Sequence, residues 1–325
     1  LQDAMVAIKA NKSLEEVQHL LRGNNEFYLK SPQEMTNIFS ELPEAISNTL
    51  LISEKCSFDL ASGLGYKLPN YNTPEGYTSL TYLWELCVRA GLRRYGNITY
   101  SVKKRLMEEF RLIEKHNLAG FLLIYHEIVG MAKEIMDRLG LSDPEIPIEE
   151  RPPGRGRGSS VALLVGYLLG LSHIDPIRYN LSLERFLPED RMNLALDIDL
   201  DFPRNIREEL ILEVHKRWGW ERASLVSMRS TYQINGAVRD LGKAFSIASN
   251  QIDSITKLLD HSSIKDLEYS IKKLPEFRAR LKNHIWKEMI KLASQIEGAP
   301  RYLAQHPGGM ILSSSALTNF VPVQR

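Results

Sequence analysis

The chain has 325 residues, of which 43% are hydrophobic and 25% are charged, and its formal net charge is +1. These values are typical of a soluble globular protein with one large domain or two. The longest apolar run, residues 161–171, is too short to cross a membrane, and the N-terminus lacks the pattern of a signal peptide. Cys56 and Cys87 lack metal-ligand spacing, so we expect reduced thiols in a cytoplasmic protein.

The first 85 residues predict a helical, loop-rich region with 6 Lys and Arg against 11 Asp and Glu. Two segments open with a serine cap followed three residues later by glutamate, which is typical of a helix start. We therefore expect helices over residues 13–23, closed by Gly23, and 31–43, stopped by Pro43. A third helix is expected over residues 43–56, packed through Ile46, Leu50 and Ile52.

Residues 57–77 form a connection rich in proline, tyrosine and glycine. Helices are expected over residues 79–96 and 102–120, the second with Leu106, Phe110 and Ile113 on one apolar stripe. The run at 121–140 fits either a strand entering a helix or a buried helix, because periodicity does not separate the two. We assign no role to His126 within it.

Residues 152–160, PPGRGRGSS, form a loop rich in glycine and arginine that precedes the apolar run at 161–171. The pattern predicts a helix after the loop, with Ser159 or Ser160 as N-cap. Backbone amides at such a helix start are free to bind an anion, and the helix dipole favours one. The segment therefore predicts a phosphate site, although a lone loop of this kind also fits a plain turn.

Asp197, Asp199 and Asp201 alternate with apolar residues in LALDIDLDFP. In a strand the three carboxylates share one face, and cations are needed to neutralise them. Oxygen ligands suit Mg²⁺, and two such ions can promote phosphoryl transfer. A calcium loop of this spacing carries glycine after its third ligand, whereas Phe202 and Pro203 follow here. A solvated strand edge is the remaining alternative.

An amphipathic helix is expected over residues 205–219, followed by a short strand at 223–228. The inward side chains of this helix are expected to be Ile206, Leu210, Ile211 and Val214. Residues 231–305 read as almost entirely helical, with 12 Lys and Arg against 8 Asp and Glu. This mild excess of positive charge is compatible with contact to a phosphate backbone and equally with a solvated helix face.

Arg239 and Lys243 lie four residues apart, so they share one helix face that is either solvated or able to bind a phosphate backbone. HPGGMILS, from residue 306, predicts a glycine turn followed by a strand. We interpret His306 as structural.

The ordered set of segments GRGSS, IDPIRYNLSLERFLPEDR and DIDLDFP resembles the palm of the bacterial family C DNA polymerases, the alpha subunits of DNA polymerase III and their error-prone relatives. LQDAMVAI, GFLLIYHEIVGMAK, AVRDLGKAF and HPGGMILS resemble other family segments in the family's order, so the resemblance covers nearly the whole chain. HPGGMILS is closer to the error-prone relatives.

The resemblance implies a helix-rich α+β fold: a nucleotidyltransferase palm of the DNA polymerase beta type, with a helical thumb inserted and an N-terminal helical region. The implied domains are a connector at 1–85 that follows an absent phosphoesterase-like domain, palm at 86–230, thumb at 231–305, and a return strand to the palm at 306–325.

For the site, the resemblance implies that Asp197 and Asp199 are the catalytic metal ligands for two Mg²⁺ ions, which Mn²⁺ can replace. Asp201, on the same strand face, is expected either to support the metal ligands without binding the metal or to be structural. The implied contacts to the triphosphate come from Arg157, Gly158, Ser159 and Arg185, and the implied contacts to DNA from Arg239 and Lys243.

This sequence departs from the family pattern at two places. Leu196 stands where the family has proline, and the spacing between Arg185 and the aspartates is one residue longer.

The implied reaction is DNA-directed DNA synthesis, in which a primer 3′-hydroxyl attacks the α-phosphorus of a deoxynucleoside triphosphate. Primer–template DNA, deoxynucleoside triphosphates and further replication subunits are the implied partners. The family's third catalytic aspartate and its fingers lie beyond Arg325, so we expect a fragment that does not polymerise by itself. A nucleotidyltransferase for a small molecule or protein, and a non-catalytic DNA-binding module, remain as alternatives.

Overall fold

The computed structural model describes residues 1–57, 59, 70–184, 187–189, 198–258, 269, 275 and 279–324. The chain divides into two compact units, each built from two stretches of sequence. Unit 1 comprises Leu1–Asp59 and Ser227–His306, and unit 2 comprises Leu60–Val226 and Pro307–Arg325. The architecture is helix-rich with small sheets, as expected for an α+β fold. No helix among these residues is both long and apolar enough to span a membrane.

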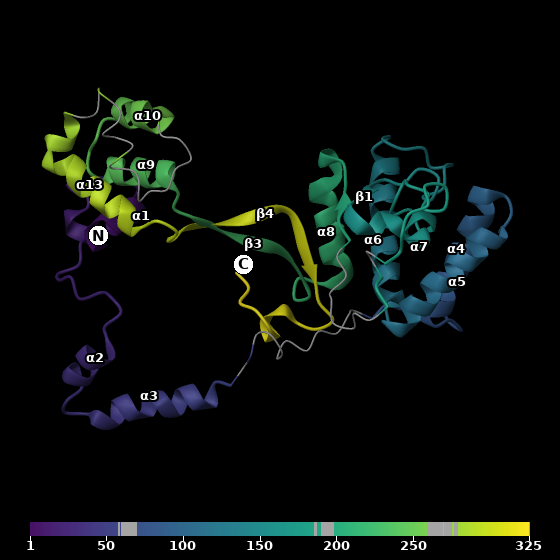
Figure 1. Ribbon diagram of the computed structural model, residues 1–325, viewed down its shortest axis with the longest axis horizontal. Coiled ribbons are helices and arrows are strands. Elements are labelled where there is room, and N and C mark those ends of the chain that lie inside the picture. The colour runs from purple at the N-terminus through teal and green to yellow at the C-terminus, as the bar shows by residue number, and fades with distance from the viewer. Residues whose placement is uncertain are drawn as a thin grey trace. The chain divides into compact units, whose positions relative to one another are not determined.

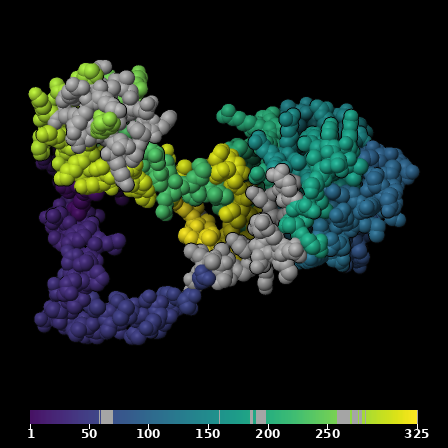
Figure 2. Space-filling view, in the orientation of Figure 1, coloured from purple at the N-terminus to yellow at the C-terminus, as the bar shows by residue number. Residues whose placement is uncertain are grey.

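The core of unit 2 is formed by helices that pack side by side, and Figure 2 shows their blue and teal residues as one continuous body. These helices are α4 (Ser79–Tyr95), α5 (Tyr100–Lys115), α6 (Ala119–Arg138) and the short α7 (Leu164–Leu168). The predicted stripe of α5 is confirmed, because Leu106, Phe110 and Ile113 are all buried. The run at 121–140 is helical throughout α6.

Helix α8 (Arg207–Trp218) packs against α6 through a separate small cluster, shown side by side in Figure 1. Ile206 and Leu210 are buried there beside Ala132 and Ile135. Gly219 ends the helix with a positive φ of 85°, as its position after the amphipathic pattern predicted.

Two strands of unit 2 form a short antiparallel ribbon that joins the glycine-rich loop to the aspartate segment. Strand β1 (Arg155–Gly156) pairs with β2 (Leu200–Asp201), with Arg155 opposite Asp201 and Gly156 opposite Leu200. The Arg157 amide continues the pairing by donating to the Asp199 carbonyl oxygen at 3.0 Å.

Unit 1 has its own core, formed by α1 (Gln2–Ala10), α9 (Ile234–Ala244), α10 (Ser249–Leu258) and α13 (His284–Gln295). Ala4 of α1 is buried together with Val238 and Leu241 of α9, although more than 200 positions separate them in the sequence. The N-terminal segment therefore completes the core of the helical region that follows residue 231.

Strands β3 (Ala223–Thr231) and β4 (Pro300–Leu312) pair as the ribbon seen in Figure 1, and the boundary between the units falls inside both strands. The expected glycine turn at HPGG is wrong, because Gly308 and Gly309 lie within β4 and keep extended backbone. Pairing with β3 gives this stretch a backbone partner, which outweighs the local turn preference of two glycines.

The N-terminal expectations are confirmed only in part. Helix α2 (Pro32–Ile38) has the predicted capping box of Ser31 and Glu34, but it ends at Ile38, and Pro43 instead opens α3 (Pro43–Lys55). The prediction that α3 packs through Leu50 and Ile52 is wrong, since 66% and 62% of their surfaces are exposed.

The helix expected over residues 13–23 is also wrong, since only a 3-10 turn at Gln18–Leu20 forms. Ser13 and Glu16 do make the reciprocal capping hydrogen bonds. The Leu14 amide, however, donates to the Ala244 carbonyl oxygen of α9 at 2.8 Å, and Val17 is buried beside Ala7 and Ala244. Isolated helices this short are marginal, so these tertiary contacts decide the conformation.

Candidate active site

The β1–β2 ribbon has one charged face and one packed face. Asp199 and Asp201 are exposed together with Arg155 and Arg157, whereas Ile198 is buried. The alternation predicted for the aspartate strand is therefore confirmed over its described part. The same alternation continues through the loop, which adds Arg155 to the charged face, a residue that the sequence pattern did not single out.

The loop glycines serve close packing on the opposite face. A Cβ atom at Gly156 would lie 2.5 Å from the Leu171 carbonyl oxygen, and one at Gly154 would lie 2.9 Å from the Asp201 carbonyl oxygen. Any other residue would force the ribbon away from its neighbours. Gly158 differs, because nothing lies within 4 Å of its Cβ position but its φ is +65°, a value that glycine adopts without strain.

The apolar run after the loop is not one continuous helix, which corrects the expectation of a helix capped by Ser159 or Ser160. A 3-10 turn spans Gly158–Ala162 with Arg157 as its N-cap, and Leu163 separates it from α7. The Ser160 hydroxyl donates to the Arg157 carbonyl oxygen at 2.7 Å, so it stabilises the turn from inside.

The amides that open α7 are not free, because a carboxyl group from α5 binds them. Leu164 N–H and Val165 N–H each donate to a different oxygen of Glu109 at 2.8 Å. Arg105 donates through Nε to Glu109 and through Nη2 to the Ala162 carbonyl oxygen, both at 2.8 Å. Burial raises the pKa of Glu109, while the Val165 and Leu164 amides and Arg105 oppose this increase.

Glu109 and Arg105 were not expected to be near the site, yet the sequence contains a signal for Glu109. It lies on the buried stripe of α5 between Leu106 and Ile113, where an unpaired charge is costly. A charged residue on an apolar stripe indicates a buried partner, but not which one.

The structure brings together three of the residues expected at the site. The backbone of Arg157 is hydrogen-bonded to that of Asp199, and Gly158 directly follows Arg157 in the chain. Asp197 and Arg185 lie outside the described residues, and so does the side chain of Ser159. Within the described part of the chain, no three His, Cys, Asp or Glu side chains cluster as a metal site.

Arg157 is paired with a carboxylate on its own ribbon. Its Nε donates to Asp201 Oδ2, and the two side chains are 67% and 48% exposed. An exposed ion pair of this kind contributes little to stability. The Arg157 side chain can therefore exchange Asp201 for another anion at small cost.

The two residues expected to contact DNA each bind a different partner in unit 1. Arg239 Nη1 donates to Asp253 of α10 at 2.7 Å, and Lys243 Nζ donates to Asn11 Oδ1 at 2.6 Å. Both side chains are exposed on α9. Their contact with DNA stays a prediction.

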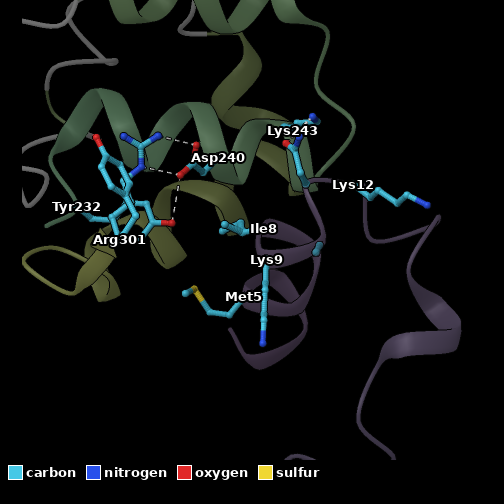
Figure 3. Close-up of a pocket in the computed structure, with 11 residues that line it drawn as sticks. Met5, Ile8, Lys9, Lys12, Tyr232, Asp240, Lys243 and Arg301 are labelled. Atoms are coloured by element: carbon cyan, nitrogen blue, oxygen red, sulfur yellow. Dashed lines mark hydrogen bonds and ion pairs between the residues drawn. The ribbon is translucent and has the colours of Figure 1, made fainter. Parts of the chain in front are cut away.

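A cavity of about 420 Å³ lies between α1, α9 and β4 in unit 1. Arg301 binds both oxygens of Asp240 at 2.8 and 2.9 Å, and the Tyr232 hydroxyl donates to Asp240 at 3.2 Å. Figure 3 shows these three side chains turned toward one another, with the ammonium groups of Lys9 and Lys12 directed away from them. The cations that line the cavity therefore do not converge on one anion position.

A family model described as the bacterial DNA polymerase III alpha NTPase domain matches residues 81–325. An error-prone DNA polymerase of Pseudomonas syringae pv. syringae (strain B728a) is 32% identical over 325 residues, which are 100% of this chain and 30% of that protein. The DNA polymerase III subunit alpha of Bacillus subtilis (strain 168) is 30% identical over 297 residues, 91% of this chain and 25% of that protein. The chain thus spans under a third of the length of these two relatives.

Proposed function

This chain belongs to the bacterial DNA polymerase III alpha family, and we propose that it contributes the metal- and triphosphate-binding part of a DNA-directed DNA polymerase. The supporting observation is the pairing of β1 with β2, in which the Arg157 amide donates to the Asp199 carbonyl oxygen. A nucleotide bound at the turn that begins with Gly158 would thus lie beside an aspartate.

Asp197 and Asp199 would hold two Mg²⁺ ions in this proposal. Asp199 is a suitable Mg²⁺ ligand, because its carboxylate is exposed on the charged ribbon face and offers the oxygen atoms that Mg²⁺ prefers. When bound, such ions supply charge neutralisation at the reacting phosphate. Asp201 is assigned a structural role, consistent with its pairing to Arg157.

The triphosphate would be bound by the backbone of Gly158 and Ser159 and by the guanidinium groups of Arg157 and Arg185. A guanidinium fork matches phosphate oxygens in shape and charge. Arg157 is already placed on the charged ribbon face, and its exposed pair with Asp201 is weak enough to be replaced.

Primer–template DNA would lie against the thumb, where Arg239 and Lys243 are the proposed contacts to its phosphate backbone. We retain the palm at 86–230 and the thumb at 231–305 as proposed domains, with a palm of the DNA polymerase beta type. Deoxynucleoside triphosphates are the proposed second substrate.

Binding of Mn²⁺ to the chain, followed by electron paramagnetic resonance, tests the metal assignment directly. Asp199→Asn is expected to weaken Mn²⁺ binding by about tenfold or more, since loss of an outer partner alone costs that much in metal sites. Glu213→Gln is the matched control, because it removes an equal charge from a partly exposed side chain of α8 in the same unit. Equal Mn²⁺ affinity in Asp199→Asn and the unmodified chain would contradict the proposal.

A mobility-shift titration with primer–template DNA tests the nucleic-acid assignment. Affinity should fall by at least about tenfold between roughly 50 and 200 mM salt if the chain neutralises several phosphates. Arg239→Gln with Lys243→Gln should reduce that salt dependence. Failure to bind DNA, together with intact binding of a nucleotide, would favour a nucleotidyltransferase that acts on a small molecule or protein.

A further inference from the structure

Helix α5 anchors the end of the turn that is proposed to bind the triphosphate. Glu109 of α5 is 0% exposed, and its carboxyl group accepts hydrogen bonds from the Leu164 and Val165 amides. These two amides are the first of α7, which follows the 3-10 turn at Gly158–Ala162 after one residue, Leu163. The carboxyl group therefore fixes the chain at the point where the turn ends.

Arg105 extends this attachment to the turn itself. Its Nη2 donates to the Ala162 carbonyl oxygen, while its Nε donates to Glu109. The pair thus binds the backbone on both sides of Leu163, where φ and ψ of −77° and 123° change the direction of the chain. Residues 105 and 109 lie one helical turn apart, so α5 presents both groups on one face.

The other end of the turn is held by the ribbon. The Arg157 amide donates to Asp199, and the Ser160 hydroxyl donates to the Arg157 carbonyl oxygen. Gly158 and Ser159 therefore lie between two anchored points. Binding groups act best when their position is set before the ligand arrives.

We propose that Arg105 and Glu109 are positioning residues for triphosphate binding, acting through the turn at Gly158–Ala162. This inference rests on the proposed function of that turn. The amides of Leu164 and Val165, at the start of α7, already donate to the Glu109 carboxyl group, so they do not bind the triphosphate in this proposal. The triphosphate is left with the amides of the preceding turn.

Isothermal titration of the chain with dATP in the presence of Mg²⁺, combined with hydrogen exchange, tests the inference. Glu109→Gln keeps one acceptor oxygen but places an NH₂ group where the second amide needs an acceptor. We expect dATP to bind about tenfold more weakly, since charge-assisted hydrogen bonds are among the stronger ones. Amide exchange at Leu164 and Val165 should accelerate, and exchange within the Gly158–Ala162 turn should accelerate with it.

Lys133→Met is the matched control for lost stability. Lys133 is a second buried ion of unit 2, with Asp137 and the Asp143 carbonyl oxygen as partners. Both variants are compared at temperatures at which they are fully folded. Lys133→Met should leave dATP affinity unchanged, and a loss equal to that of Glu109→Gln would show that the effect is one of stability, overturning the inference.

Two further outcomes are distinguishable. If the unmodified chain binds dATP and Glu109→Gln binds it equally well, the positioning role is wrong while the proposed function stands. If the unmodified chain does not bind dATP with Mg²⁺, the proposed function fails, and the positioning role fails with it.

Arg105→Met should weaken dATP binding and accelerate amide exchange as Glu109→Gln does. The double variant should bind dATP no more weakly than either single variant if the pair acts as one unit.

Discussion

Arg157 illustrates how one residue can have two electrostatic partners. On the charged ribbon face it is paired with Asp201, which lies diagonally across from it, and it also borders the turn proposed to bind a triphosphate. A triphosphate carries more charge than one carboxylate, so it should displace Asp201 from the guanidinium. Asp201 then affects nucleotide affinity without touching the nucleotide.

Asp201→Asn should therefore strengthen dATP binding, by at most about fivefold, because an exposed ion pair contributes roughly 1 kcal/mol or less. Titration calorimetry with Mg²⁺ present measures the change, and Glu213→Gln controls for the lost charge. Weaker binding instead would indicate that Asp201 is a metal ligand, contrary to its assignment as structural.

Helices α6 and α7 depend on each other through a histidine for which sequence indicated no role. His126 of α6 donates from Nδ1 to the Leu169 carbonyl oxygen, just after the end of α7, at 2.9 Å. Burial lowers the pKa of His126 below its usual 6.5, although the bond to Leu169 opposes this. The imidazole is therefore a neutral donor that closes the end of a short helix.

This pKa shift predicts that the chain loses stability as the pH falls. Below about pH 6.5 the unfolded chain binds a proton at His126, whereas the folded chain does so only at lower pH. The contribution of neutral His126 to the free energy of unfolding is fully present above pH 6.5, and it is lost as the pH falls through the pKa of His126 in the folded chain. Its slope is at most about 1.4 kcal/mol per pH unit.

Urea unfolding at a series of pH values measures this slope. His126→Asn can still donate to Leu169 but does not titrate, so its free energy of unfolding should change less over the same pH range. Identical pH profiles for the two proteins would rule out His126 as the source.

At the scale of the whole molecule, each unit is assembled from two distant stretches of the chain. The family match begins at residue 81, yet the core of unit 1 includes Ala4 and is extended by Met5 and Ile8. Lys243 and Asn11 add a hydrogen bond between α9 and the end of α1. The helical region after residue 231 is therefore incomplete without the N-terminal segment.

A chain shortened to residues 70–325 should show faster amide exchange in α9 and α13 than the full chain. Removing α1 exposes apolar surface on α9, at a cost of roughly 25 cal/mol per Å². Exchange in α5 and α6 should not change, because their core lies in unit 2 and, among the residues that the structure describes, includes none before Tyr71. Unchanged exchange in α9 would show that its packing against α1 contributes little.

The sequence by itself determined the features that depend on local periodicity. The stripe of α5, the amphipathic α8 and the alternation around Asp199 follow from spacings of 3.6 and 2 residues, which set the buried face within each element. Only the tertiary structure decided which elements meet. Glu109 binds amides more than 50 positions away, Arg157 pairs with Asp199, and Leu14 bonds to Ala244 instead of continuing a helix. Such contacts depend on how the whole chain packs, and no local pattern specifies the partner of a buried charge or a free amide.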